Sequence, residues 1–276
     1  MLCYAPSTST KIRFKIISFS FLFTGLVEHF LYVYSTGIKA VMTKIESHES
    51  FAKLYFVTVY DGFFYIFDYA HWKAVYVEFV AVVTTFIWQF TDLFLILMTS
   101  SLAERFEQIN VFVRENKVLS EVEWRNIRNQ YNRLSLLCNV FNKSLSEVIL
   151  LSYSANVFFI SIALFQAIHS RTSFEMIFIL FNTTFIVIHF LLVSKYSSWV
   201  YEESGAIISE ISSFPVQHIN HEVDRLLHQM VEREIGVCGG GFFKVTRQVV
   251  FNVFNIILTL QLIFVQFKAS FSAKVN

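Results

Sequence analysis

Three closely spaced side chains, Trp88, Gln89 and Asp92, could together bind a polyhydroxylated molecule. An amide or a carboxylate can bond to two adjacent hydroxyl groups, and an indole face can cover the apolar C–H surface of a sugar ring. On a helix the three residues would lie within about one and a half turns. Asp92 could equally make a buried polar contact that locks two helices, so both roles stay open at this position.

Other ionisable side chains also interrupt apolar stretches of the chain. Glu28 and His29 fall in one such stretch, and Glu78 falls in the stretch that contains Trp88. A charged group at membrane depth is costly, so it usually faces protein, a partner or water. Glu28 is therefore a further candidate for ligand binding. For His189, in a later apolar stretch, we expect an interhelical hydrogen bond instead.

The elements that must position these residues are membrane helices. Of the 276 residues, 55% are hydrophobic and 16% are charged, and the mean hydropathy is +0.53. These values are typical of membrane proteins. The chain has only two prolines and eight glycines, and a helix in hydrocarbon satisfies its own backbone hydrogen bonds. We therefore predict an all-α, polytopic transmembrane protein.

Five stretches are long enough to cross a bilayer core about 30 Å thick. The predicted spans lie near residues 14–37, 74–100, 147–168, 174–196 and 243–267. Residues 51–72 are rich in Tyr and Phe, but Asp61 and Asp68 interrupt them. We interpret this segment as an aromatic, interfacial loop rather than a sixth span.

Basic residues set the predicted orientation. The connection 101–146 carries Arg105, Arg114, Lys117, Arg125, Arg128, Arg133 and Lys143. The link between the third and fourth spans carries only Arg171, so the positive-inside rule makes 101–146 cytoplasmic. The domain organisation is then a cytoplasmic segment 1–13, a transmembrane domain 14–267 and an extracellular tail 268–276.

Helical periodicity continues beyond the membrane in two connections. Apolar residues recur at steps of three and four at Trp124, Ile127, Tyr131, Leu134 and Leu137. A second stripe, within 221–234, consists of Val223, Leu226, Leu227, Met230 and Val231. Both patterns predict amphipathic helices that pack beneath the membrane.

Several classes of function find no support in the sequence. A net charge of +1 gives no field that would attract nucleic acid. The three cysteines are far apart, and His218, His221 and His228 lack a matching set of acids or thiols. No nucleophile elbow or phosphate-binding loop occurs. We expect neither an enzyme nor a cofactor or metal site.

The last apolar segment carries a motif. Residues 259–267 read TLQLIFVQF, which resembles the C-terminal signature of insect gustatory receptors: Thr-Tyr, five hydrophobic residues, then Gln-Phe. Leu260 stands in the Tyr position and Gln261 in the first hydrophobic slot. The sugar-taste branch of this family is similar in five further elements, Glu28-His29, 67–73, 86–94, 102–106 and 240–247, in the same order along the chain.

This resemblance implies the seven-helix channel fold of gustatory and odorant receptors. In that alignment the five spans correspond to the family's third to seventh helices, and the first two are not represented. The family implies a cation channel subunit opened by a tastant, here a sugar, within a homo- or hetero-tetramer. It would lie among membrane lipid in the plasma membrane of a chemosensory neuron. A non-conducting modulatory subunit and a membrane transporter are the alternatives.

The resemblance also assigns the last helix to the pore. One face of this helix carries Thr259, Leu262, Ile263 and Gln266. If these residues line the pore, Phe267 is the bulky side chain next to them. A polar ring of Gln266 side chains would replace part of an ion's hydration. Without a fourfold axis, the same residues would face lipid or pack. Gly239–Gly241 precede this helix and are interpreted as its hinge.

Overall fold

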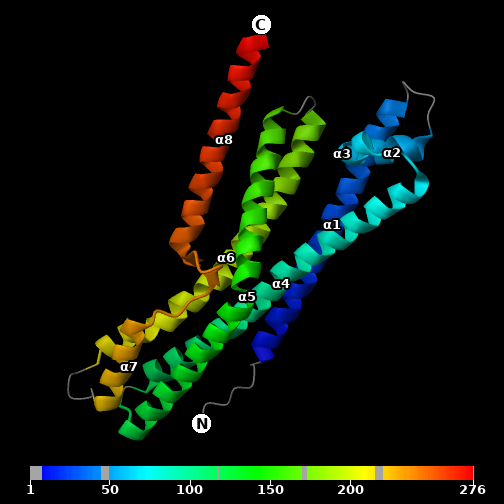
Figure 1. Ribbon diagram of the computed structural model, residues 1–276. Coiled ribbons are helices and arrows are strands. Elements are labelled where there is room, and N and C mark those ends of the chain that lie inside the picture. Colours follow the sequence, from blue (N-terminus) through cyan, green and yellow to red (C-terminus); the bar gives the residue numbers. More distant parts are fainter. Residues whose placement is uncertain (1–7, 45–49, 117, 170–172, 215–219, 276) are drawn as a thin grey trace. The chain divides into compact units, whose positions relative to one another are not determined.

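The computed structural model describes residues 8–44, 50–116, 118–169, 173–214 and 220–275 (Figure 1). The chain divides into two compact units, Pro6–Leu93 and Phe94–Asn276 with Met1–Ala5. Among the described residues, five helices are long and apolar enough to cross a membrane. The all-α fold with five candidate spans is therefore confirmed.

The unit Pro6–Leu93 is built from three helices and the beginning of a fourth. They are α1 (Thr8–Lys44), α2 (Phe51–Val59), α3 (Asp61–Ile66) and the first half of α4 (His71–Glu115). The interpretation of 51–72 as a loop is wrong, because most of this segment forms α2 and α3. Asp61 does not break the helical structure, since it lies in the first turn of α3, where the positive end of the helix dipole favours a carboxylate.

A glycine allows α1 and α4 to approach closely within this unit. A Cβ atom added at Gly25 of α1 would overlap the side-chain amide of Gln89 on α4. Gly25 itself is buried. A larger residue at this position would require the flexible end of the Gln89 side chain to move.

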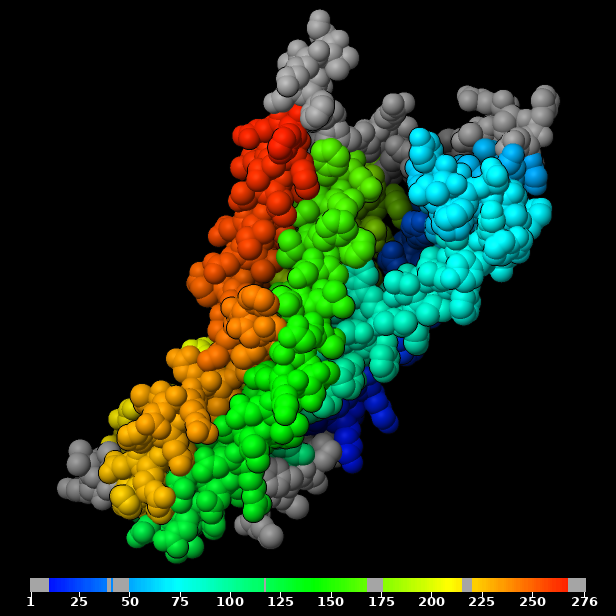
Figure 2. All heavy atoms as spheres, in the orientation of Figure 1, coloured from blue at the N-terminus to red at the C-terminus, as the bar shows by residue number. Residues whose placement is uncertain are grey.

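The unit that contains Phe94–Asn276 holds the rest of α4 and most of the buried core. Its further elements are α5 (Glu121–His169), α6 (Ser173–Ser212), α7 (His221–Glu232), β1 (Cys238–Gly239), β2 (Phe243–Lys244) and α8 (Arg247–Val275). Helix α5 is the hub, because α6, α7, β1 and α8 all pack against it. Figure 2 shows α8, in red, on the surface beside the green α5.

Four predicted spans fall inside helices, and the fifth begins too early. Segments 14–37, 74–100, 147–168 and 174–196 lie within α1, α4, α5 and α6. The last helix starts at Arg247 rather than near residue 243. The reason is that Phe243 and Lys244 pair with Gly239 and Cys238 in a short antiparallel ladder.

Beyond the apolar spans, α4 to α7 enclose a second core, which we call the α7 core. It consists of Phe106, Ile109, Val113, Trp124, Ile127, Tyr131, Ile207, Ile211, Val223, Leu226 and Met230, all buried. The predicted amphipathic helices are thus present. Leu137 and Val231 were wrongly assigned to the buried stripes, and are 54% and 74% exposed. The helical period places Cys138 inward instead of Leu137, while Met230, already part of the predicted stripe, is buried.

One buried carboxylate joins α7 to α5. Glu222 Oε2 accepts a hydrogen bond of 2.6 Å from Arg128 Nε, and the Glu222 side chain is only 5% exposed. The Arg128 hydrogen bond holds the pKa of Glu222 below its usual value, against the opposing effect of burial. Asn220 begins α7 by accepting the backbone N–H of Val223 at 3.1 Å.

Candidate functional site

An acidic and aromatic cluster lies within the unit Pro6–Leu93. The hydroxyl of Tyr60 donates a hydrogen bond to Glu78 Oε2 at 3.0 Å. Tyr60 is the junction residue that ends α2 and begins α3, and Glu78 lies in the second turn of α4. The two short helices therefore hold the Tyr60 phenol within hydrogen-bond distance of the Glu78 carboxylate on α4.

Two more tyrosines and a second carboxylate belong to the same cluster. Tyr32 on α1 lies within electrostatic range of Glu28, Tyr55 and Glu78, and Tyr60 lies within range of Tyr32 and Tyr55. All five side chains are half-buried. We call Glu28, Tyr32, Tyr55, Tyr60 and Glu78 the tyrosine–glutamate cluster.

The chemistry of this cluster suits a molecule with many hydroxyl groups. Burial and the neighbouring Glu78 carboxylate raise the pKa of Tyr60, so its phenol stays protonated and can donate a hydrogen bond. A carboxylate can accept two or more such bonds, and the tyrosine rings offer apolar faces. Donors, acceptors and flat apolar surfaces are thereby combined in one place.

The ligand-binding candidates from the sequence fall into two groups. Glu28 belongs to the tyrosine–glutamate cluster. Gln89 lies against Gly25, about one helical turn before Glu28 on α1. Trp88 is half-buried next to it. Asp92 is 1% exposed, which favours the alternative role of a helix contact over direct access for a ligand.

Sequence reasoning did not select Tyr32, Tyr55, Tyr60 or Glu78 as site residues. Glu78 lies ten residues before Trp88 on α4, a rise of about 15 Å, so spacing along one helix could not connect it to the predicted group. The available signal was the Tyr-rich composition of 51–72. Its interpretation as a loop hid the fact that its tyrosines would be held in place.

The pore candidates all lie on the exposed face of α8. Thr259, Leu262, Ile263, Gln266 and Phe267 are exposed. The opposite face of the helix packs on the bundle: Val253 and Ile257 are buried, and the Phe264 ring lies 5.4 Å from that of Phe165 on α5. The two faces of α8 thus have different environments, and the one with the pore candidates is the more exposed.

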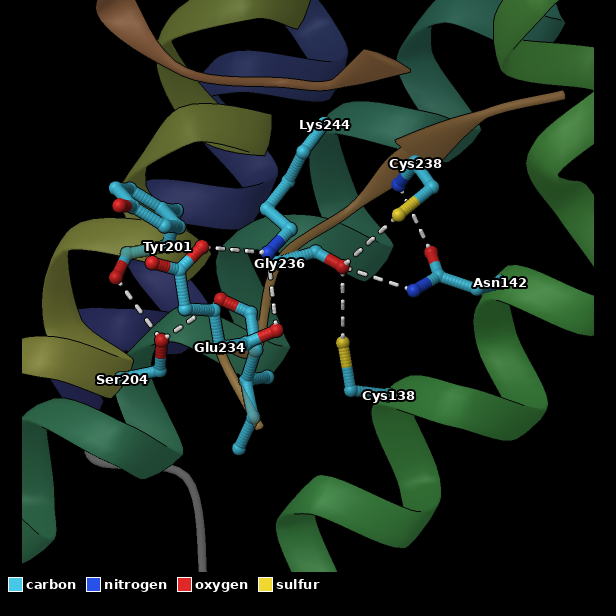
Figure 3. A network of polar contacts seen from close by, with 9 residues as sticks. Cys138, Asn142, Tyr201, Ser204, Glu234, Gly236, Cys238 and Lys244 are labelled. Carbon is cyan, nitrogen blue, oxygen red and sulfur yellow. Dashed lines mark hydrogen bonds and ion pairs between the residues drawn. The ribbon is translucent and has the colours of Figure 1, made fainter. Parts of the chain in front are cut away.

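A polar network fixes the segment that leads into α8 (Figure 3). The Asn142 side chain of α5 donates to the Gly236 carbonyl at 2.8 Å and accepts the Cys238 N–H at 3.0 Å. Lys244 Nζ lies 3.1 Å from Glu234 Oε2 and 5.7 Å from the centre of the Tyr201 ring. The β1–β2 hairpin is therefore held between α5 and α6.

Gly239 ends strand β1, and Gly240 and Gly241 lie in the turn of this hairpin. Gly240 and Gly241 have φ angles of 56° and 72°, a left-handed region that glycine adopts without strain. The Gly240 N–H donates to the Ser146 carbonyl of α5 at 2.8 Å. Their role as a hinge stays a prediction.

The described residues contain no group of three or more His, Cys, Asp or Glu that could hold a metal ion. His228 lies 3.3 Å from Glu232 on the same helix. His218 lies outside the described residues. Cys138 and Cys238 are free thiols.

The fold defines a multi-pass helical membrane protein, and sequence comparison identifies its family. A family model described as "Trehalose receptor" matches residues 2–275. Three relatives from Drosophila melanogaster are the gustatory receptors for sugar taste 64f and 64a and gustatory receptor 5a for trehalose. The first is 30% identical over 77% of this chain and 46% of its own length. The other two are 25% and 22% identical, over 95% and 92% of this chain and 59% and 57% of their own.

This chain therefore belongs to the trehalose receptor family, within the sugar-taste branch of the gustatory receptors. The chain spans about half of the length of these relatives. The family consists of receptors rather than enzymes, as the sequence analysis predicted.

Proposed function

We propose that this chain is a gustatory receptor subunit that binds a sugar and gates a cation pore. The observation that carries the sugar-binding part is the contact between Tyr60 and Glu78 inside the tyrosine–glutamate cluster. The names of the relatives, which refer to sugar taste and to trehalose, support the same class of ligand.

In this proposal the carboxylates of Glu28 and Glu78 accept hydrogen bonds from sugar hydroxyls, while the phenols of Tyr32, Tyr55 and Tyr60 donate or accept them. The tyrosine rings cover apolar C–H surfaces of the sugar, and Trp88, further along α4, is a separate candidate for the same role. Sugar must displace the Tyr60–Glu78 hydrogen bond or extend it. A ligand opens a channel only if it binds the open arrangement more tightly than the closed one.

The proposed pore uses the exposed face of α8. Four subunits, of this chain or of this chain with other gustatory receptors, would surround the ion path with Thr259, Leu262, Ile263, Gln266 and Phe267. The apolar side chains would form a constriction that gates by dewetting, and the Gln266 amides a polar ring. Membrane lipid would cover the remaining apolar surface.

The proposed location is the plasma membrane of a chemosensory neuron, with the N-terminus in the cytoplasm and the C-terminus outside. The basic residues of 101–146 support this orientation. It would expose the α2–α3 segment, with its tyrosines, to the outer solution from which a tastant arrives.

Binding of trehalose and sucrose to the purified chain in nanodiscs tests the proposal. Glu78→Gln removes a charged acceptor, and a hydrogen bond to a charged group contributes about 1.5–3 kcal/mol. We therefore expect Glu78→Gln to weaken sugar binding roughly tenfold or more, and Tyr60→Phe to weaken it less.

Tyr65→Phe is the matched control, because Tyr65 is 91% exposed on α3. Equal sugar affinity in all three variants would contradict the assignment of the site. Sugar binding without any sugar-evoked current would make the chain a non-conducting subunit.

A further inference from the structure

A single side-chain hydrogen bond ties α8 to α5 at membrane depth. Gln261 Nε2 donates to the backbone carbonyl oxygen of Ser161 at 2.7 Å. The two residues are 100 positions apart in the sequence. Gln261 follows the buried Ile257 by one turn on the packed face of α8, away from the exposed face that carries Gln266.

The surroundings of this hydrogen bond are apolar. Ile257 is 3% exposed, and the Phe264–Phe165 ring contact lies about one turn further along α8. The Gln261 Oε1 atom is buried without a hydrogen-bond partner. An apolar residue would fill this seam without burying a polar oxygen, so packing alone does not explain a glutamine here.

The bond to Ser161 and the hairpin at the base are two of the points that join α5 to the chain of α8, beside the Asn142 hydrogen bonds and the Phe264–Phe165 ring contact. At the hairpin, the Gly240 N–H donates to the Ser146 carbonyl at 2.8 Å. Along α5, Ser146 and Ser161 are separated by 15 residues, or about 22 Å. Two fixed points at this separation set the tilt of α8 against α5, and releasing the upper one leaves the helix attached at its base.

We propose that Gln261 is a positioning residue that holds α8 against α5 and thereby sets how readily the pore opens. This inference rests on the proposed function, in which α8 lines the pore. Breaking the Gln261–Ser161 hydrogen bond destabilises the arrangement of α8 in which this bond forms. The free energy of arrangements without the bond does not change. The dose of sugar that opens the channel therefore shifts, although Gln261 touches neither the sugar nor the ion path.

Two readouts test the role of Gln261. Gln261→Met keeps the length of the side chain but removes its donor, and Gln261→Asn keeps an amide that is too short to reach Ser161. Interhelical hydrogen bonds in membranes contribute roughly 0.6 kcal/mol and up to about 1.7, which corresponds to roughly three- to sixteenfold in an equilibrium. Thr184→Val is the matched control, because the Thr184 hydroxyl is exposed and bonds only to Leu180 of its own helix, at 2.8 Å.

The first readout is hydrogen exchange of backbone amides in the purified chain in nanodiscs. We expect the backbone amides of α8 that follow Arg247 to exchange faster in both Gln261 variants, but not in Thr184→Val. The second readout is the half-maximal sugar concentration for current in cells that express the chain with a longer sugar receptor. We expect a shift of roughly three- to sixteenfold at unchanged surface amount.

The outcomes separate the two proposals. Unchanged exchange in both Gln261 variants overturns the positioning role, whatever the currents show. Faster exchange with an unchanged sugar dependence makes Gln261 a packing residue and also overturns it. A wild-type chain that gives no sugar-dependent current overturns the proposed function and the gating role with it, while the exchange data still decide whether Gln261 holds α8.

Discussion

The α7 core and the tyrosine–glutamate cluster differ in the burial and hydrogen bonding of their polar groups. In the α7 core, Trp124 is 2% exposed, and the buried carboxylate of Glu222 on α7 accepts a hydrogen bond from Arg128 at 2.6 Å. In the cluster, Glu28, Tyr32, Tyr55, Tyr60 and Glu78 are only half-buried, and Tyr60 donates a hydrogen bond to Glu78. The first region uses its polar groups to stabilise the fold. In the second region, half-buried hydroxyl and carboxylate groups are partly accessible, as the proposed sugar site requires.

Trp124→Ala should have the largest effect on stability. The indole packs in the α7 core with Phe214, at a ring distance of 6.2 Å. Replacing a buried tryptophan with alanine typically costs about 3–5 kcal/mol in free energy of unfolding. Thermal unfolding in detergent measures this loss. Val231→Ala, at a position 74% exposed on α7, is the control and should change little. Equal effects of the two substitutions would mean that α7 does not pack as described.

The Glu222–Arg128 pair should make the stability of the α7 core depend on pH. The folded pKa of Glu222 lies below its ordinary value of 4.5. Its contribution to stability is therefore complete above the ordinary pKa and is lost as pH falls through the lower, folded value. Unfolding temperatures between pH 7 and about pH 3 should fall more steeply in the wild type than in Glu222→Gln. If the unfolding temperatures of the wild type and of Glu222→Gln fell in parallel with pH, the Glu222–Arg128 pair would not contribute to stability.

Trp88→Ala should affect sugar responses more than stability. The indole is half-buried, and its loss removes a stacking face rather than a core support. A stacked aromatic contact contributes roughly 0.5–1.5 kcal/mol, or roughly three- to tenfold in the sugar concentration required. Dose–response curves at matched surface amount measure the change. An unchanged curve would assign Trp88 to packing against neighbouring helices.

Hydropathy and periodicity were sufficient to predict the long helices, but not α2 and α3 or the tertiary contacts. The five spans and the extensions of α4 and α5 follow from apolar runs and from residues such as Trp124 and Ile127 at helical spacing. The β1–β2 hairpin has strands of two residues each, which is too short for an alternating pattern. Its second strand was therefore included in the last predicted span, 243–267.

The candidate site was harder to predict for a similar reason. Glu28 and Gln89 were selectable because polar residues stand out in apolar helices. Tyr60 and Glu78 meet only because α2 and α3 fold back toward α4, and tyrosines at a membrane interface are too common to indicate a site. A hydrogen bond such as Gln261 to Ser161 depends on the relative rotation of two helices, which the sequence of either helix does not specify.

The orientation of the chain remains a prediction that a tag can test. An epitope placed after Asn276 should bind antibody on unpermeabilised cells, and one inserted near Glu115 should not. An epitope after Asn276 that stays hidden until the membrane is opened would reverse the orientation. It would then place the tyrosine–glutamate cluster away from the outer solution.

The most direct test of the central claim is the ion selectivity of sugar-evoked current when Gln266 is changed. Gln266 lies on the exposed face of α8, where four copies would form a polar ring. Gln266→Leu should reduce conductance or alter gating without loss of assembly, because leucine is favourable in a membrane helix. Gln266→Glu should favour divalent over monovalent cations through its added negative charge. Wild-type conductance and selectivity in both variants would contradict the account, because Gln266 would then face away from the ion path.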